Sequence, residues 1–345
     1  MKSEKNTILF VLPFFDNIGN FVRAECLKNY CPKDWEYIYL KGKYPKFLNI
    51  IVIRYLYRLA FYLFMVSKFC FNKKNRVAYF IIPQNPLLIF IISKIMRIKI
   101  ISDISDAQHL DVFLGYKKTK SIMEFSDAVI FESHEYEEFW KKKLKIRTYV
   151  CEDTAQHECV YLDFNKRKKK LIWVGSFHTS NYLFNYIDYF ELFKNEGYEI
   201  CILGATQALS NKLNNRGINH VSIYDYDRSF MVKEILSSKI SFIPMENSEL
   251  FNFRGSLKAK ISMAYGSLVI ASDNKQHRRI IQNKKNGFLF NTKEDLKKII
   301  KLIKSDNISS KIALEGNKSV ANNYTMKAHS NKLIDVALTL IKKNN

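Results

Sequence analysis

The chain has 345 residues, of which 47% are hydrophobic, including 26 Phe and 20 Tyr. This composition excludes a disordered protein and favours roughly two domains with buried cores. The formal net charge of +22 indicates a polyanionic partner: nucleic acid, an anionic membrane surface or a phosphate-bearing substrate. A coding bias toward Lys would give the same excess.

The first residues, MKSEKNTILFVLPFF, have a basic start, but their apolar run is short and a charged loop follows. We therefore expect a first strand and no signal peptide. The six cysteines form no C-x-x-C pair, which favours free thiols in a reducing cytoplasm.

Apolar runs of strand length alternate with longer helical segments, and this alternation predicts an α/β fold with doubly wound parallel sheets. The expected strands are 8–12, 37–40, 77–82, 98–102, 128–132, 171–174, 199–203, 240–243, 268–271 and 287–290. The expected helices are 20–29, 48–70, 87–96, 182–195, 229–236, 294–305 and 327–342.

The segment 48–71 is rich in Ile, Leu, Tyr and Phe and carries Arg54, Arg58 and Lys68 on one side of a helical wheel. Two arginines near the centre argue against a transmembrane span. An amphipathic helix on an anionic membrane surface would use these cations directly. The alternative is an ordinary helix whose apolar side covers a sheet.

Two carboxylates, Asp103 and Asp106, follow the strand near 98–102, with His109 three residues later. Histidine has the tunable pKa that a general base needs, and Glu132 after the next strand is a comparable candidate. The alternative for His109 is a capping or packing role.

The run KRKKK at 166–170 is the clearest break in composition, because a run of like charges is typical of a solvated, mobile segment. The strand pattern restarts directly after it with LIWVGSF. We therefore predict a domain boundary at 165/166, between domains at 1–165 and 166–326.

A polar turn, Gly175 to Asn181, follows the first strand of the second half. Glycine lets backbone approach a ligand, and N–H groups at the start of a helix favour an anion. The alternative is an ordinary turn in which Ser180 or Asn181 caps the helix.

The segment 254–273, RGSLKAKISMAYGSLVIASD, has two cations, Arg254 and Lys258, that one helical turn would place on the same face. Gly266 then breaks the pattern, and an apolar run typical of a buried parallel strand follows. Cations and backbone N–H groups at a helix start can hold a diphosphate.

This segment resembles the sugar-nucleotide-binding segment of GT-B glycosyltransferases, particularly glycosyltransferase family 4 and its group 1 relatives. Their pattern of basic–small–x–x–Lys, apolar residues, Gly and a strand ending in Ala-Ser is matched from Arg254 to Ser272. The resemblance implies two Rossmann-like domains facing across a cleft, the first binding an acceptor and the second a nucleotide sugar. It also implies that the last helix, about 327–345, packs back on the first domain.

The resemblance also implies the roles of individual residues. Those expected to be catalytic are Arg254, Lys258, Asp106 and His109. Those expected to bind the donor are Gly175, Ser176, His178, Asn181, Gly204, Tyr224, Tyr226, Asp227, Gly255 and Ser256, and those expected on the acceptor side are Gly19, Arg23 and Asp103. No metal or cofactor is expected, because the two cations carry the positive charge.

This chain departs from the family pattern at two positions. Many members carry glutamates where Phe253 and Ile261 stand here, and Glu246 or Glu249 could substitute from the preceding loop. The missing glutamates also admit a non-catalytic GT-B subunit that partners an active enzyme.

The leading prediction is a bacterial glycosyltransferase of retaining stereochemistry, building a surface polysaccharide such as capsule or O-antigen. Its acceptor would be a saccharide, lipid-linked and held at the inner face of the cytoplasmic membrane. A nucleic-acid-binding protein is the alternative from another class, although no helix-turn-helix, RRM or zinc pattern occurs. The absence of G-x-G-x-x-G argues against an NAD enzyme.

Overall fold

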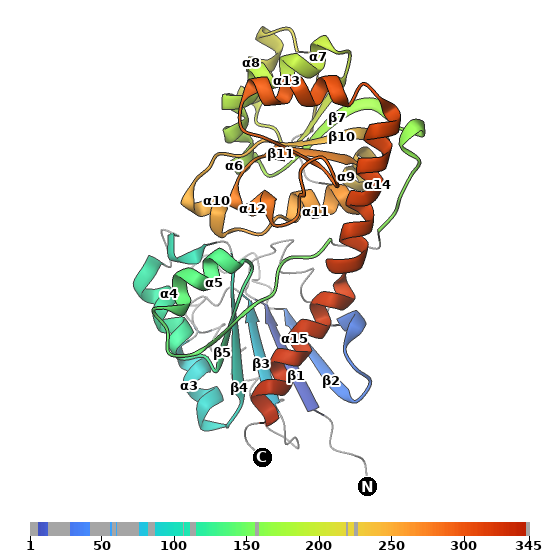
Figure 1. Cartoon of the computed structure of the whole chain (residues 1–345). Helices are drawn as coiled ribbons and strands as arrows, with labels where there is room; N and C mark the ends of the chain where they lie inside the picture. Colours follow the sequence, from blue (N-terminus) through green and yellow to red (C-terminus); the bar gives the residue numbers. More distant parts are fainter. Residues whose placement is uncertain are drawn as a thin grey trace. The chain divides into compact units, whose positions relative to one another are not determined.

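The computed structural model describes residues 6–12, 28–41, 56, 60, 76–81, 87–105, 107–110, 115–155, 159–218, 220–223 and 227–342 (Figure 1). The chain divides into two compact units, each with one six-stranded parallel β-sheet. The first unit consists of Met1–Asp153, Phe253–Gly255 and Met326–Asn345, and the second of Thr154–Asn252 and Ser256–Thr325. The predicted α/β class with parallel sheets is confirmed.

The sheet of the first unit has the order β2-β1-β3-β4-β5-β6. Its strands are β1 (Asn6–Leu12), β2 (Trp35–Lys41), β3 (Arg76–Ile81), β4 (Lys99–Ile104), β5 (Ala128–Phe131) and β6 (Arg147–Val150). Among its described residues, the unit has the helices α3 (Leu87–Ile95), η1 (Gln108–Leu110), α4 (Gly115–Glu124), α5 (His134–Lys141) and α15 (Met326–Ile341).

Alternate residues of β3 pack against helices on opposite faces of this sheet. Val77 and Tyr79 belong to the core that α15 completes, and Figure 1 shows α15 lying along the strands of the sheet. Phe80 instead meets Phe90 of α3, with ring centroids 5.0 Å apart. The period of two along the strand thus buries both faces.

The sheet of the second unit has the order β12-β11-β10-β7-β8-β9. Its strands are β7 (Lys168–Val174), β8 (Glu199–Leu203), β9 (His220–Ile223), β10 (Ser238–Ile243), β11 (Leu268–Ser272) and β12 (Phe288–Phe290). Its helices are η2 (Phe164–Lys166), α6 (Phe177–Ser180), η3 (Asn181–Tyr186), α7 (Ile187–Asn195), α8 (Gln207–Asn215), α9 (Arg228–Ser237), α10 (Glu249–Phe253), α11 (Leu257–Ala264), α12 (Lys275–Arg278), α13 (Lys293–Leu302) and α14 (Asp306–Asn323).

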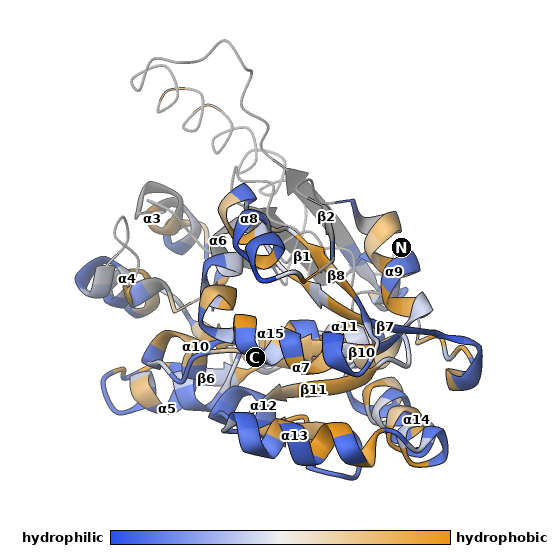
Figure 2. Ribbon diagram, turned by 90° about the horizontal axis from the view of Figure 1, so that it is seen from above, coloured by the Kyte–Doolittle hydropathy of each residue, from blue (hydrophilic) through white to orange (hydrophobic). Residues whose placement is uncertain are grey.

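Helix α13 shows how the helices of this unit meet its core. Leu296, Ile299 and Ile300 are buried, whereas Lys297 and Lys298 are exposed. Figure 2 shows the resulting hydrophobic and hydrophilic sides of α13 in orange and blue. This amphipathic pattern buries one stripe of the helix against the sheet.

The run 166–170 differs from the sequence prediction, because two of its five cations are buried. Arg167 is 4% and Lys170 is 3% exposed, and β7 begins at Lys168. The guanidinium of Arg167 donates to the carbonyl oxygens of Leu162, Ile235, Ser238 and Tyr265, and the Lys170 amine pairs with Glu234 at 2.5 Å. The prediction of a solvated, mobile segment is therefore wrong.

Gly266, which the sequence analysis used as a break, ends α11 with φ of 69°. A Cβ at this position would lie 2.8 Å from a terminal nitrogen of Arg167. The glycine therefore supplies both the left-handed turn and room for the buried guanidinium.

Other elements differ in extent from the prediction. The helix expected over 182–195 begins as the 3₁₀ helix η3 and becomes regular only from Ile187. The short strands β6 and β9 and helices such as α4, α5, α8 and α14 were not predicted. The segment 48–71 lies outside the described residues except for positions 56 and 60. Within the described part of the chain, each helix is too short or too polar to span a bilayer.

Candidate active site

The topology of the second sheet has a switch point at the carboxyl ends of β7 and β10. From β7 the chain runs through β8 and β9 on one side, and it returns through β10, β11 and β12 on the other. At such a switch point the two strand-end loops depart in opposite directions and leave room for a ligand. The loop after β7 begins with Gly175, and the loop after β10 leads from Pro244 to Glu246.

Two predicted donor-binding glycines, Gly175 and Gly204, pack against each other at this edge. Gly204 has φ of 84°, and a Cβ there would lie 1.9 Å from the Gly175 carbonyl oxygen. The Gly175 N–H donates to the Leu203 carbonyl oxygen at 3.0 Å. Because a side chain on Gly204 would collide with backbone, the close approach of these two turns requires glycine.

The turn after Gly175 is closed by its own side chains. Ser176 caps α6 and forms a capping box with Thr179, whose hydroxyl accepts from the Ser176 N–H at 3.0 Å. Asn181 follows α6 and is exposed, and the side chain of His178 lies outside the described residues. Ser176 is therefore the N-cap residue of α6, whereas Ser180 stands at the N-cap position of η3, with which the helix expected over 182–195 begins.

Lys258, in the first turn of α11, reaches the turn after β7. Its amine lies 4.6 Å from the ring centroid of Trp173 and 3.4 Å from the Thr179 hydroxyl oxygen. A cation over an indole face is stabilised by the ring quadrupole. The sequence analysis did not predict Trp173 or Thr179, although both stand within four residues of the chosen glycine.

Arg254 does not share a helical face with Lys258, so that prediction is wrong. It lies in the bend between α10 and α11, because α11 begins only at Leu257. Arg254 and Gly255 belong to the first unit, and a Cβ on Gly255 would lie 3.2 Å from an Asp153 carboxylate oxygen. Ser256, the N-cap of α11, donates its hydroxyl to the Gln276 carbonyl oxygen.

In the first unit His109 is packed in an aromatic cluster rather than exposed to solvent. It is 7% exposed, its Nδ1 lies 3.1 Å from the Tyr136 hydroxyl, and its ring centroid is 4.7 Å from Phe139 and 5.4 Å from Phe253. Burial, aided by the charge of Lys143, lowers the pKa of His109 to about 4. The imidazole is therefore neutral at physiological pH.

The other predicted residues fall in several places. Asp103 is fully buried in β4 and bonds to the Tyr79 hydroxyl. Asp227 is exposed and caps α9, and its pKa is lowered by hydrogen bonds, first from the Ser229 hydroxyl. The predicted residues that lie outside the described part of the chain are Gly19, Arg23, Asp106, Tyr224 and Tyr226.

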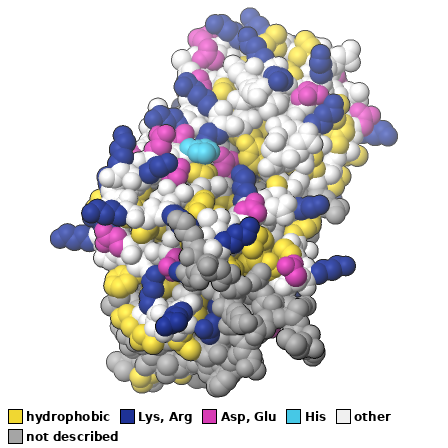
Figure 3. All heavy atoms as spheres, turned by 60° about the horizontal axis from the view of Figure 1, so that its bottom comes forward, with side chains coloured by type: hydrophobic (Ala, Val, Ile, Leu, Met, Phe, Trp, Pro, Cys, Tyr) yellow, Lys and Arg dark blue, Asp and Glu magenta, His cyan; other side chains and the backbone are white. Residues whose placement is uncertain are grey.

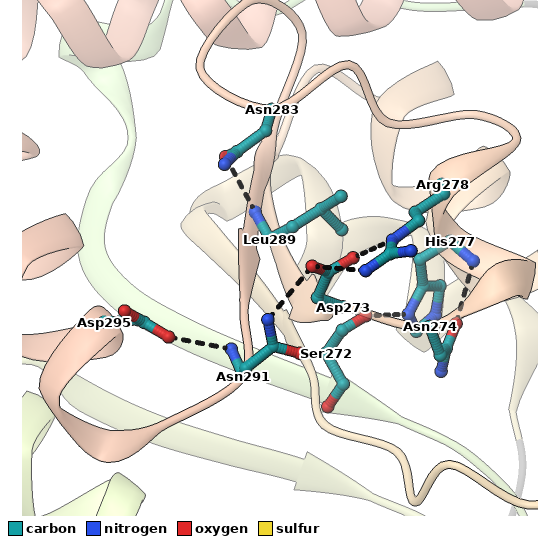
Figure 4. A network of polar contacts seen from close by, with 9 residues as sticks. All are labelled: Ser272, Asp273, Asn274, His277, Arg278, Asn283, Leu289, Asn291 and Asp295. Atoms are coloured by element: carbon teal, nitrogen blue, oxygen red, sulfur yellow. Dashed lines mark hydrogen bonds and ion pairs between the residues drawn. The ribbon is translucent and has the colours of Figure 1, made fainter.

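A polar network, drawn in Figure 4, closes the carboxyl ends of β11 and β12. Arg278 contacts both carboxylate oxygens of Asp273, at 2.5 and 3.0 Å, and the Asn291 amide donates to the same carboxylate at 3.1 Å. His277 is 1% exposed, and its Nδ1 donates to the Ser272 carbonyl oxygen at 2.7 Å. Burial, followed by the charges of Lys258 and Arg279, lowers the pKa of His277 to about 4.

Charged side chains give no further site among the described residues. No group of three or more His, Cys, Asp and Glu side chains there could hold a metal ion. On the face shown in Figure 3, Lys and Arg are interspersed with acidic and hydrophobic side chains. The four described cysteines, Cys31, Cys151, Cys159 and Cys201, are free.

Comparison with known proteins identifies a family domain in part of the chain. Residues 161–319 match the model of the family Glycosyl transferases group 1. No curated protein matches the chain in sequence.

Several solved structures share the fold. HepE of Anabaena in complex with UDP has a TM-score of 0.67 and 10% identity, with 97% of this chain and 100% of that chain covered. Sucrose-phosphate synthase of Thermosynechococcus elongatus has a TM-score of 0.67 and 11% identity, with 98% of this chain and 100% of that chain covered. The UDP-forming α,α-trehalose-phosphate synthase of Burkholderia vietnamiensis has a TM-score of 0.63 and 9% identity, with 97% of this chain and 100% of that chain covered. The chain therefore has the GT-B fold of these structures, and its residues 161–319 form a glycosyl transferases group 1 domain.

Proposed function

We propose that this glycosyltransferase moves a sugar from a nucleotide-diphosphate sugar to a saccharide acceptor with retention at the anomeric carbon. The observation that carries the proposal is the position of the Lys258 amine, which lies at the switch point of the second sheet beside Thr179 and over Trp173. UDP-glucose is the first donor to test, because HepE, which shares the fold, is described in complex with it.

In the proposed reaction the bond between the anomeric carbon and the diphosphate oxygen breaks, and the acceptor hydroxyl oxygen forms the new bond to that carbon. Negative charge develops on the leaving diphosphate, and the Lys258 ammonium neutralises it. A diphosphate oxygen takes the proton of the acceptor hydroxyl, as the family resemblance implies. This scheme does not require a protein nucleophile.

The proposed acceptor is a saccharide held at an anionic membrane surface, in the synthesis of a bacterial surface polysaccharide such as capsule or O-antigen. The net charge of +22 and the basic, aromatic segment 48–71 support this proposal. Liposomes with anionic lipid should retain the enzyme at low salt, and raising the salt concentration should release it.

The test of the central proposal is Lys258→Met, measured as UDP release and sugar transfer from UDP-glucose. We expect kcat/KM to fall by about 10²–10³-fold, on the scale of one lost oxyanion-stabilising donor. Lys212→Met is the matched control, because Lys212 is an exposed lysine of the same unit whose amine lies 5.3 Å from the ring centroid of Phe184. Equal turnover in Lys258→Met and wild type would contradict the proposal.

A non-catalytic partner subunit is the second candidate, and Phe253 favours it. This residue stands where many relatives carry a glutamate, and its ring stacks on Tyr136 with centroids 5.1 Å apart. A purified chain that binds UDP but neither hydrolyses nor transfers the donor sugar would establish this candidate. If transfer occurs, the anomeric configuration of the product, determined by NMR, tests retention.

A further inference from the structure

We propose that Glu246 binds vicinal hydroxyl groups of the donor, either those of the ribose or those of the transferred sugar. This inference rests on the proposed function and adds a donor-binding residue to it. Glu246 is the third residue after β10, and Gly175 directly follows β7. Glu246 therefore lies at the switch point of the second sheet, in the loop that faces the turn of Gly175.

The Glu246 carboxylate is held by a residue from the other side of this switch point. The Asn185 amide, in η3, donates to its Oε1 at 2.7 Å. Because η3 follows the turn after β7 and Glu246 follows β10, this hydrogen bond ties together the two loops that flank the expected crevice.

The backbone before Glu246 is fixed by β11. The Met245 N–H donates to the Ser272 hydroxyl at 2.8 Å, and Met245 and Ser272 are both buried. Tyr186 lies close by, since burial and then the charge of Glu246 raise the pKa of its phenol, whereas Ser272 lowers it. A carboxylate positioned in this way loses little freedom when it binds a ligand.

Glu246 differs from other carboxylates of the second unit in its partner. Glu234 pairs with Lys170, Asp273 with Arg278 and Asp306 with Lys239, whereas Glu246 accepts from a neutral amide and has no ion pair among the described residues. Its side chain is half-buried.

The chemistry of a carboxylate identifies the part of the donor that it would bind. An ionised carboxylate only accepts hydrogen bonds, and its two oxygens can accept from two neighbouring hydroxyls. The same charge repels phosphate, which suits the Lys258 ammonium instead. A nucleotide sugar has vicinal hydroxyls on both its ribose and its sugar, so both sources fit.

The experiment compares Glu246→Gln with wild type by calorimetric titration of UDP-glucose, UDP and 2′-deoxy-UDP. Gln keeps the size of the side chain and an acceptor for Asn185, but it removes the charge. We expect UDP-glucose to bind about 10- to 100-fold more weakly, on the scale of a hydrogen bond to a charged group. Glu199→Gln is the control, because Glu199 is an exposed glutamate at the amino end of β8, at the opposite edge of the sheet from Glu246. The affinity of this control for UDP-glucose should equal that of wild type.

The pattern across ligands identifies the hydroxyls. If Glu246→Gln lowers the affinity for UDP as strongly as that for UDP-glucose, Glu246 binds the ribose hydroxyls. The affinity for 2′-deoxy-UDP should then be the same in Glu246→Gln and wild type. If the substitution lowers the affinity for UDP-glucose but not for UDP, Glu246 binds hydroxyls of the transferred sugar. The affinity for a donor that lacks these sugar hydroxyls should then be the same in Glu246→Gln and wild type.

Three results would overturn the inference. Glu246→Gln that binds UDP-glucose like wild type, while Lys258→Met loses activity, rejects the inference and leaves the proposed function standing. A loss that is equally large for the deoxy analogues shows a structural role. If wild type binds no nucleotide sugar, both the proposed function and the inference that rests on it fail.

Discussion

Arg167 and Lys258 are both cations of the second unit, but their surroundings differ. Arg167 is 4% exposed and donates to backbone carbonyl oxygens from three separate parts of the unit, near 162, 235–238 and 265. Lys258 is partly buried beside Trp173 and Thr179, and its charge is one of the two that disfavour protonation of His277.

This difference distinguishes a cation that stabilises the fold from a cation that we expect to bind a ligand. Carbonyl oxygens satisfy the Arg167 guanidinium within the fold, so its charge is used for folding. The charges of Lys258 and Arg279 both act on His277, and positive charges gathered in this way favour an approaching anion. A buried cation bonded to carbonyl oxygens should therefore affect stability, whereas a cation beside a strand-end turn should affect donor binding.

The largest effect that we expect is on stability, for Arg167→Met. The change leaves the carbonyl oxygens of Leu162, Ile235, Ser238 and Tyr265 without this donor. Because each buried, unsatisfied polar group costs about 1–3 kcal/mol, the free energy of unfolding should fall by roughly 3–5 kcal/mol. Urea denaturation of the variant and of wild type measures this difference in the free energy of unfolding.

Lys258→Met is the matched control for this prediction. Its free energy of unfolding should stay within about 1 kcal/mol of the wild-type value, the scale of a cation–π contact, although its kcat/KM is expected to fall. If Arg167→Met is as stable as wild type, or if Lys258→Met is the less stable of the two, the distinction between the two cations is wrong.

The sequence predicted the sheets well because buried strands have a distinct pattern. All ten strands expected from apolar runs are present, since parallel strands covered on both faces are continuously hydrophobic. The two missed strands, β6 and β9, are edge strands of four residues each, and the RTYV of β6 is only half-buried. Edge strands need less hydrophobic sequence, so they have a weaker pattern.

The candidate site was only partly predictable. Gly175, Gly204 and Lys258 were chosen from local sequence, and the structure gives a physical role to each. The contact of Lys258 with Trp173, and that of Glu246 with Asn185, join segments more than 60 residues apart. No local periodicity encodes such contacts, because they depend on strand order.

Acid should weaken the fold near Lys258 through His277. Its pKa is about 4 in the folded chain and about 6.5 when unfolded, so between these values only the unfolded state binds the proton. The stabilising contribution is complete above about pH 6.5 and is lost as pH falls toward 4. Between pH 7 and pH 5 it should decrease by about 2 kcal/mol.

His277→Gln tests this contribution, because the Gln amide can still donate to the Ser272 carbonyl oxygen that His277 Nδ1 contacts. The variant should have a shallower decrease of unfolding free energy from pH 7 to pH 5 than wild type. His109, whose pKa is also about 4, contributes equally to both proteins. Parallel pH profiles for the two proteins would reject the assignment to His277.

The smallest effect that we expect is for the exposed lysines of the basic run 166–170. Lys168 and Lys169 flank the buried positions Arg167 and Lys170 but are exposed, and the amine of Lys169 lies 5.2 Å from the Tyr198 ring centroid. Replacing both with Ala should change the free energy of unfolding by less than about 1 kcal/mol, since exposed substitutions cost about 0.5 kcal/mol or less each. Urea denaturation beside Arg167→Met measures the contrast. A double variant as unstable as Arg167→Met would mean that the charge of the whole run, rather than the carbonyl contacts of one guanidinium, stabilises the start of β7.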